Sequence, residues 1–169
     1  MLMRQVMTLI CLIFFGACIS NDPEFAPSQF DRDFFNLTTN EQIKQFSKYG
    51  IETQYELLVV GNQVVHPPAL YLIEEFARKG ETVIPFLHTK LNQAKRDVAV
   101  RDIVAILSEM QRLRTYDVQG DASLMALAEN RIAAMQGQWK LVTQHMIEEI
   151  RRPMPKDVKS GKVESKARG

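Results

Sequence analysis

The chain has 169 residues, enough for one domain after a short targeting segment. Hydrophobic residues make up 46% of it and charged residues 24%, which is a globular composition and excludes a chain that is disordered throughout. The formal net charge of +1 combines the single charge of Arg4 in residues 1–17 with a net −5 over residues 18–150 and a net +5 over residues 151–169. A mildly acidic body argues against a nucleic-acid-binding domain, which would carry a basic face.

The first seventeen residues have the layout of a secretory signal peptide. Arg4 supplies a basic start, and Val6–Phe15 is an apolar segment. This segment is too short to span a bilayer, which takes about 20 apolar residues. An ordinary signal-peptidase cut after Ala17 would place the bulky Phe15 at a position that prefers a small residue, so such a cut is disfavoured.

Phe15-Gly16-Ala17-Cys18 resembles a bacterial lipobox, the motif cut by the lipoprotein signal peptidase, although Leu is typical at the position of Phe15. The resemblance implies that residues 1–17 form a lipoprotein signal peptide and that Cys18 becomes the first mature residue and carries the lipid. Each acyl chain would contribute about 0.8 kcal/mol per buried CH₂ to membrane binding. The alternatives are an uncleaved signal anchor and a plain signal peptide.

The residue after the lipobox favours one membrane. Ile19 stands where an inner-membrane retention signal often has Asp, so we expect a lipid anchor in the outer membrane of the bacterial envelope, facing the periplasm. Cys11 would leave with the signal and Cys18 would be acylated. No free thiol would then remain for a disulfide or a metal.

Residues 18–37 predict a lipidated tether, because they are polar and contain two prolines. The segment also holds four phenylalanines: Phe25, Phe30, Phe34 and Phe35. These aromatic side chains could form a partner-binding peptide. We favour the alternative that residues 30–37 pack back onto the following domain.

Residues 38–152 predict a helical domain. Its first helix begins at Thr38, because Thr38 and Glu41 have the spacing of a capping box, and Gly50 is a suitable end. Ile51–Val65 has helical spacing, but its sequence also matches two short strands around a Gly-Asn turn. The neighbouring helices favour a helix there.

His66-Pro67-Pro68 breaks the chain and begins the next helix, Ala69–Lys79, with Leu70, Ile73, Phe76 and Ala77 facing inward and Gly80 at its end. Two further helices are predicted at Glu81–Ala94, with Pro85 in the first turn, and at Asp97–Arg114. The second of these has an apolar stripe made of Val100, Ile103, Val104, Leu107 and Met110.

Asp121 is expected to cap one long helix that continues to Arg152. Apolar residues recur along it at helical spacing: Leu124, Ala128, Ile132, Met135, Trp139, Val142, Met146 and Ile150. Gly137 interrupts this pattern at a cost of about 1 kcal/mol and favours a bend. Residues 153–169 are basic and lack apolar periodicity, so they predict a disordered tail.

The stretch Gly80–Met110 resembles a HEAT-type repeat. It contains Gly-Glu-Thr-Val-Ile-Pro-Phe-Leu, then a polar turn, then Val-Arg-Asp-Ile-Val. The resemblance implies an all-α fold whose antiparallel helix pairs, 38–60, 68–94 and 97–152, stack as a short HEAT-like α-solenoid. The alternative is a compact irregular helical bundle, which the irregular period and the long last helix favour.

The sequence predicts no catalytic residue, no metal site and no cofactor. His66, His88 and His145 lack the spacing of a metal motif. The neighbouring pairs Glu74-Glu75 and Glu148-Glu149 point about 100° apart on a helix, so neither is a ready acid–base pair. Trp139 is expected to pack in the core.

The leading functional hypothesis is a lipid-anchored adaptor that binds an unidentified envelope protein and no nucleic acid. An envelope-tethered enzyme or small-ligand carrier is the alternative, and a deep polar pocket near His66, His88 or Tyr55 would favour it. A third hypothesis is a lysis or immunity-type lipoprotein that acts on the membrane. It predicts exposed apolar residues along the last helix.

Overall fold

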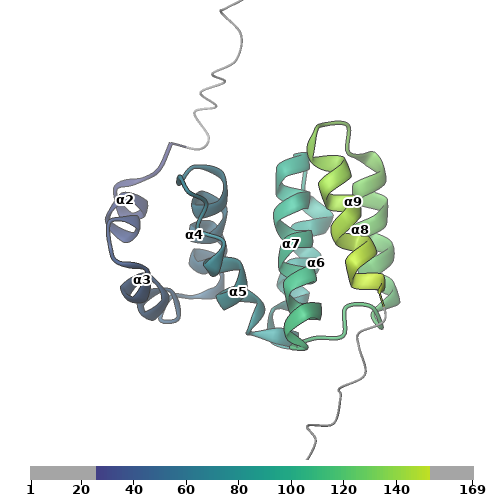
Figure 1. The fold of residues 1–169 in the computed structure, drawn as a ribbon, viewed down its shortest axis with the longest axis horizontal. Coiled ribbons are helices and arrows are strands. Elements are labelled where there is room, and N and C mark those ends of the chain that lie inside the picture. The colour runs from purple at the N-terminus through teal and green to yellow at the C-terminus, as the bar shows by residue number, and fades with distance from the viewer. Residues whose placement is uncertain (1–25, 153–169) are drawn as a thin grey trace, which may run out of the picture.

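The computed structural model describes residues 26–152, and this part of the chain is helical with no strand (Figure 1). The predicted all-α class is therefore confirmed. The predicted signal peptide, Cys18 and the basic residues 153–169 lie outside the described residues. The elements are α2 (Gln29–Phe35), α3 (Thr39–Phe46), α4 (Ile51–Gln63), α5 (Tyr71–Ala77), the 3₁₀ helix η2 (Gly80–Val83), α6 (Ile84–Gln93), α7 (Asp97–Leu113), α8 (Ala122–Ala134) and α9 (Trp139–Arg151).

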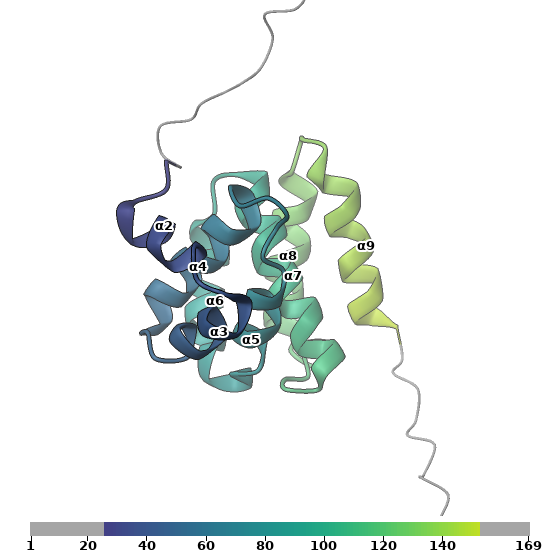
Figure 2. The ribbon, with the colours of Figure 1, turned by 60° about the vertical axis from the view of Figure 1, so that its left-hand side comes forward.

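The central element is α7, which packs against α5 on one side and α9 on the other. Behind this row, α6 packs against α8 (Figure 1). The turned view places α9 at the outer edge of the molecule (Figure 2). The predicted stripe of α7 is buried, and its residues Ile103, Leu107 and Met110 have no exposed surface. Burial of these apolar side chains is the main force that holds the row together.

The folded domain begins before the predicted boundary at Thr38. Ser28 caps α2 through a capping box with Asp31, whose carboxylate accepts the Ser28 N–H at 2.8 Å. Phe34 is 3% exposed and lies against Phe35 and Tyr49. The prediction that this segment packs onto the domain is confirmed. Its assignment to a tether is wrong for the residues of α2, because aromatic burial and a cap stabilise a helix there.

Two predictions at the next helices have different outcomes. Thr38 caps α3, and the Glu41 carboxylate accepts the Thr38 N–H at 3.0 Å, as the capping box predicts. The hydrogen bond from the Thr38 hydroxyl at 2.7 Å, together with that from the Thr38 N–H, lowers the pKa of Glu41. Gly50 does not end α3, which stops at Phe46; with φ −64° and extended backbone it is the N-cap of α4. Ile51–Gln63 forms a helix, which confirms the favoured alternative over a hairpin.

The helix after the prolines is shorter than predicted. α5 spans Tyr71–Ala77, and Leu70 precedes it with 59% of its surface exposed, so the inward position expected of Leu70 is wrong. Ile73, Phe76 and Ala77 are buried as predicted. Since α5 ends before Gly80, this glycine instead opens η2 in the left-handed conformation, with φ +57°.

The long C-terminal helix is two helices, α8 and α9, so the prediction of one helix is wrong. The break lies at residues 135–138, where the Asp97 carboxylate accepts the N–H groups of Gln136 at 3.0 Å and Gly137 at 2.6 Å. These bonds satisfy backbone donors that the turn leaves without helical partners. The turn brings α9 back against α7. Val142, predicted to be inward, is consequently 46% exposed, while Thr143 and Ile147 are buried.

We expect Asp97→Ala to lower the free energy of unfolding by about 1–2 kcal/mol, because two backbone N–H groups at the start of α9 lose their charged acceptor. Chemical denaturation measures this loss. Asp33→Ala is the matched control, since Asp33 is an exposed carboxylate that accepts only from Gln29 within its own helix. Equal losses in the two variants would contradict this role of Asp97.

Candidate functional site

An open groove of about 560 Å³ lies on the row formed by α5, α7 and α9. Its walls come from three helices that are distant in sequence. The side chains that line the groove form an apolar floor with three carboxylates, and no Lys or Arg is among these lining residues. The lining residues are Leu70, Tyr71, Ile73, Glu74, Ala105, Ser108, Glu109, Met146 and Glu149.

The apolar part of the groove is held in place by the α5 segment. Ile73 is buried to 8% exposure, whereas Leu70 stays largely exposed at the edge of the groove. The Tyr71 hydroxyl donates to the side-chain oxygen of Gln42, a buried residue of α3, which fixes the ring. Burial raises the pKa of Tyr71. Met146 reaches the groove from α9 and is half-buried, so apolar surface continues across the three helices.

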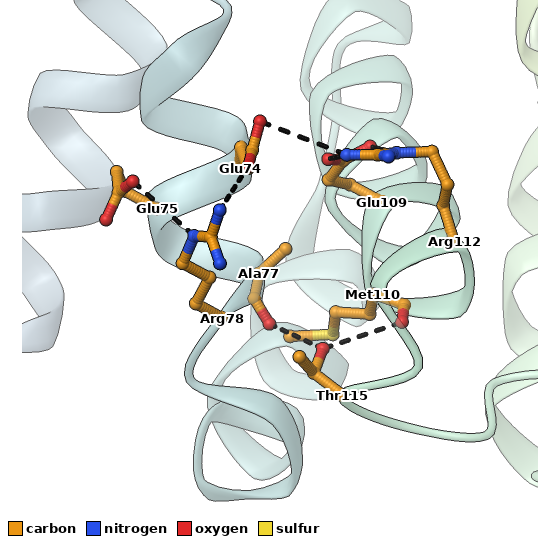
Figure 3. Close-up of polar contacts among 8 residues, drawn as sticks. All are labelled: Glu74, Glu75, Ala77, Arg78, Glu109, Met110, Arg112 and Thr115. Carbon is orange, nitrogen blue, oxygen red and sulfur yellow. Dashed lines mark hydrogen bonds and ion pairs between the residues drawn. The ribbon is translucent and has the colours of Figure 1, made fainter. Parts of the chain in front are cut away.

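Two carboxylates face each other between α5 and α7 (Figure 3). Glu109 accepts from the Arg112 Nε at 2.8 Å, and the same guanidinium lies 3.9 Å from Glu74. On its other side Glu74 pairs with Arg78, at the i,i+4 spacing that favours such a pair on a helix. Glu75 has the same i,i+4 spacing to Lys79, but its carboxylate instead lies 3.5 Å from the Arg78 Nε. Glu74 and Glu109 therefore lie close to the same Arg112 guanidinium at the groove.

The third carboxylate of the groove belongs to α9. Glu149 lies 3.5 Å from the His145 Nε2 and 3.7 Å from a guanidinium nitrogen of Arg152. All three of these side chains are about half exposed or more. Ion pairs this exposed are screened by water and contribute little to stability. Glu149 is therefore presented to solvent at the α9 side of the groove.

A separate buried polar cluster surrounds Asp102, which has no exposed surface. Its carboxylate accepts from Asn62, from Gln63 at 2.6 Å, and from the Nε of Arg101 at 2.9 Å. Arg101 in turn stacks on the Trp139 ring, with 4.2 Å between the guanidinium carbon and the ring centre. Burial raises the pKa of Asp102, against the opposing effect of Arg101 and the hydrogen bonds.

A buried carboxyl with a raised pKa is a common feature of active sites. The Asp102 carboxylate, however, is occupied by donors from α4 and α7, and it does not line the groove. We therefore assign this cluster to the junction between α4 and α7. The spacing of residues within one helix did not predict this cluster, because Asn62 and Gln63 lie 40 and 39 positions away from Asp102 in the sequence.

The structure does not bring the three histidines together. His66 lies between α4 and α5, His88 on α6 and His145 on α9, and each is exposed. Within residues 26–152, no group of three or more His, Cys, Asp or Glu side chains is placed to hold a metal ion. Tyr55 packs against Phe86, with 5.4 Å between ring centres, and lies outside the groove.

None of the helices in the described range is both long enough and apolar enough to cross a membrane. The chain was also compared with known proteins. It matches no protein-family model, no curated protein and no solved structure.

Proposed function

We propose that this chain is a lipid-anchored protein of the bacterial envelope whose helical domain binds a protein partner in the groove between α5, α7 and α9. The observation that carries the proposal is the composition of this groove. It is open, it spans three helices, and it combines exposed apolar surface with three carboxylates. Aromatic and aliphatic anchors within a polar rim are typical of protein-binding surfaces.

The packing of alternate helices supports an adaptor role. α5, α7 and α9 lie side by side, and α6 lies beside α8, so helix pairs follow one another along the molecule. We propose that this is a short HEAT-like stack, in agreement with the resemblance of residues 80–110. Stacked helix pairs create extended surfaces that bind other proteins. The lipobox supports the membrane anchor, with Cys18 as the proposed lipidation site.

The location of the groove favours an adaptor over an enzyme or small-ligand carrier. A deep polar pocket around His66, His88 or Tyr55 would have favoured an enzyme or a small-ligand carrier. None of these three residues lines the groove. The remaining hypothesis, direct action on the membrane, draws support from Leu141 and Val142, which are 78% and 46% exposed on α9. Dye release from lipid vesicles by the purified protein would favour that hypothesis over the adaptor.

The proposal is tested by chemical crosslinking in intact cells, followed by membrane purification and mass spectrometry, with Cys18→Ala in parallel. We expect one recurrent crosslinked partner for the natural sequence, incorporation of labelled palmitate at Cys18, and loss of both in the variant. A variant that is processed and membrane-bound like the natural sequence would refute the lipid anchor. A lipidated protein without a recurrent partner would refute the adaptor.

A further inference from the structure

The charges around the groove are unequal. Four carboxylates lie in or beside it, and three guanidinium groups pair with them; no Lys is among these residues. The acidic residues are Glu74, Glu75, Glu109 and Glu149, and the basic ones are Arg78, Arg112 and Arg152. These residues carry a net charge of −1, and the side chains that line the groove itself include three Glu and no Lys or Arg.

The carboxylates are available to a ligand, although each has an Arg neighbour. The side chains of Arg78, Arg112 and Arg152 are 54%, 62% and 65% exposed, so their ion pairs are screened and exchange readily with another cation. Glu109 is the most shielded carboxylate, at 20% exposure. A cation that reaches Glu109 is therefore attracted more strongly than one on the open surface, because the local dielectric constant is lower.

The apolar part of the groove sets a second requirement on the ligand. Leu70 has 59% of its surface exposed beside the buried Ile73, so an apolar group placed there would remove both its own surface and that of Leu70 from water. Met146, on the opposite wall, can adjust to different apolar shapes because its side chain is unbranched. The two walls suit an aliphatic or aromatic anchor.

Building on the proposed adaptor function, we propose that the groove binds a segment of the partner protein in which Lys or Arg side chains flank an apolar anchor. The apolar side chain lies against Leu70 and Met146. The basic side chains lie against Glu109 of α7 and Glu149 of α9. Charge disfavours anionic lipids and nucleic acids on the same surface, since Glu74, Glu109 and Glu149 line the groove and no Lys or Arg does.

Binding of two synthetic peptides to the full chain in nonionic detergent tests this proposal. Both peptides have the same Leu spacing, and one has Lys where the other has Glu. By fluorescence anisotropy, we expect the Lys peptide to bind at least about tenfold more tightly than the Glu peptide. The affinity for the Lys peptide is expected to fall as the salt concentration rises. Glu109→Gln combined with Glu149→Gln is expected to weaken Lys-peptide binding about tenfold.

Glu56→Gln is the matched control, because Glu56 is an exposed carboxylate on α4, away from the groove. It is expected to leave binding unchanged, and thermal melting checks that all variants stay folded. Equal binding of the two peptides, or unchanged binding by the double variant, would overturn the proposal. Removal of residues 153–169, which are themselves basic, is expected to leave the affinity unchanged; a tenfold increase would identify the chain's own tail as the occupant and overturn the assignment to a partner.

The cellular experiment separates this inference from the function on which it rests. If the double variant in the cell keeps the recurrent crosslinked partner at full yield, the charge requirement is wrong and the adaptor function stands. If the natural sequence yields no partner, the adaptor function itself is refuted. The result that supports both is a partner whose yield falls in the double variant and is unchanged in Glu56→Gln.

Discussion

Asp102→Ala is expected to lower the free energy of unfolding by about 3–5 kcal/mol, the range for the loss of one partner from a buried ion pair. Asp102 is fully buried, and Arg101 beside it is only 9% exposed. Removing the carboxylate leaves the Arg101 charge and the side-chain amides of Asn62 and Gln63 without their acceptor. Such a loss is a large part of the stability of an ordinary domain, which is about 5–15 kcal/mol.

Denaturation in urea, followed by circular dichroism, measures this effect. Glu56→Ala is a suitable control because it removes an exposed carboxylate from α4, and we expect it to change the free energy of unfolding by less than about 0.5 kcal/mol. A loss below about 1 kcal/mol in Asp102→Ala would show that the cluster does not join α4 to α7 as described.

The same carboxyl predicts a pH dependence. Because burial raises the pKa of Asp102 in the folded protein, the unfolded chain releases this proton at lower pH than the folded protein does. At pH values between the ordinary pKa of Asp in the unfolded chain and the raised pKa of Asp102 in the folded protein, the unfolded state binds fewer protons than the folded state. In this range Asp102 therefore makes the free energy of unfolding fall as the pH rises. We therefore expect the difference in free energy of unfolding between the natural protein and Asp102→Asn to shift against the natural protein as the pH rises through this range. The opposite shift would contradict the raised pKa.

Gly80→Ala is expected to lower the free energy of unfolding by about 2–4 kcal/mol. Gly80 has φ +57°, a conformation that costs other residues about 1–2 kcal/mol. A Cβ at this position would also lie 2.5 Å from the backbone oxygen of Thr115, which cannot move aside like a flexible side chain. Thr115 is fixed because its hydroxyl donates to the Ala77 carbonyl at 2.7 Å (Figure 3).

Gly50→Ala provides the comparison for this substitution. Gly50 has φ −64°, and a Cβ there would meet no atom within 4 Å, so we expect a change of less than about 1 kcal/mol. Thermal or chemical denaturation of the two variants gives the difference. Similar stabilities for Gly80→Ala and Gly50→Ala would mean that the contact between η2 and the loop at Thr115 is looser than described.

The elements with strong local signals were predictable from the sequence. The apolar stripe of α7 placed that helix to within one residue at its end, and Thr38 and Asp121 were identified as caps from side chains that accept nearby backbone N–H groups. The break between α8 and α9 was not located, because apolar residues keep their helical spacing through it. The carboxylate of Asp97, far away in sequence, stabilises the turn there.

The groove was beyond prediction for a similar reason. Its walls come from α5, α7 and α9, and only the packing of these helices brings Glu74, Glu109 and Glu149 to one surface. Leu70 has the spacing of a core residue and was expected to be inward, yet the short helix α5 leaves it exposed. Its exposure depends on where α5 begins, and the two prolines before it indicated that start only approximately.

The most direct test of the groove as a binding surface is photo-crosslinking in intact cells. A photoreactive benzoylphenylalanine replaces Ser108, on the α7 wall of the groove, and in a control strain it replaces Glu56. We predict a light-dependent adduct with one recurrent envelope protein from position 108 and none from position 56. No adduct from position 108, or equal adducts from both positions, would contradict the proposal that this groove binds a partner.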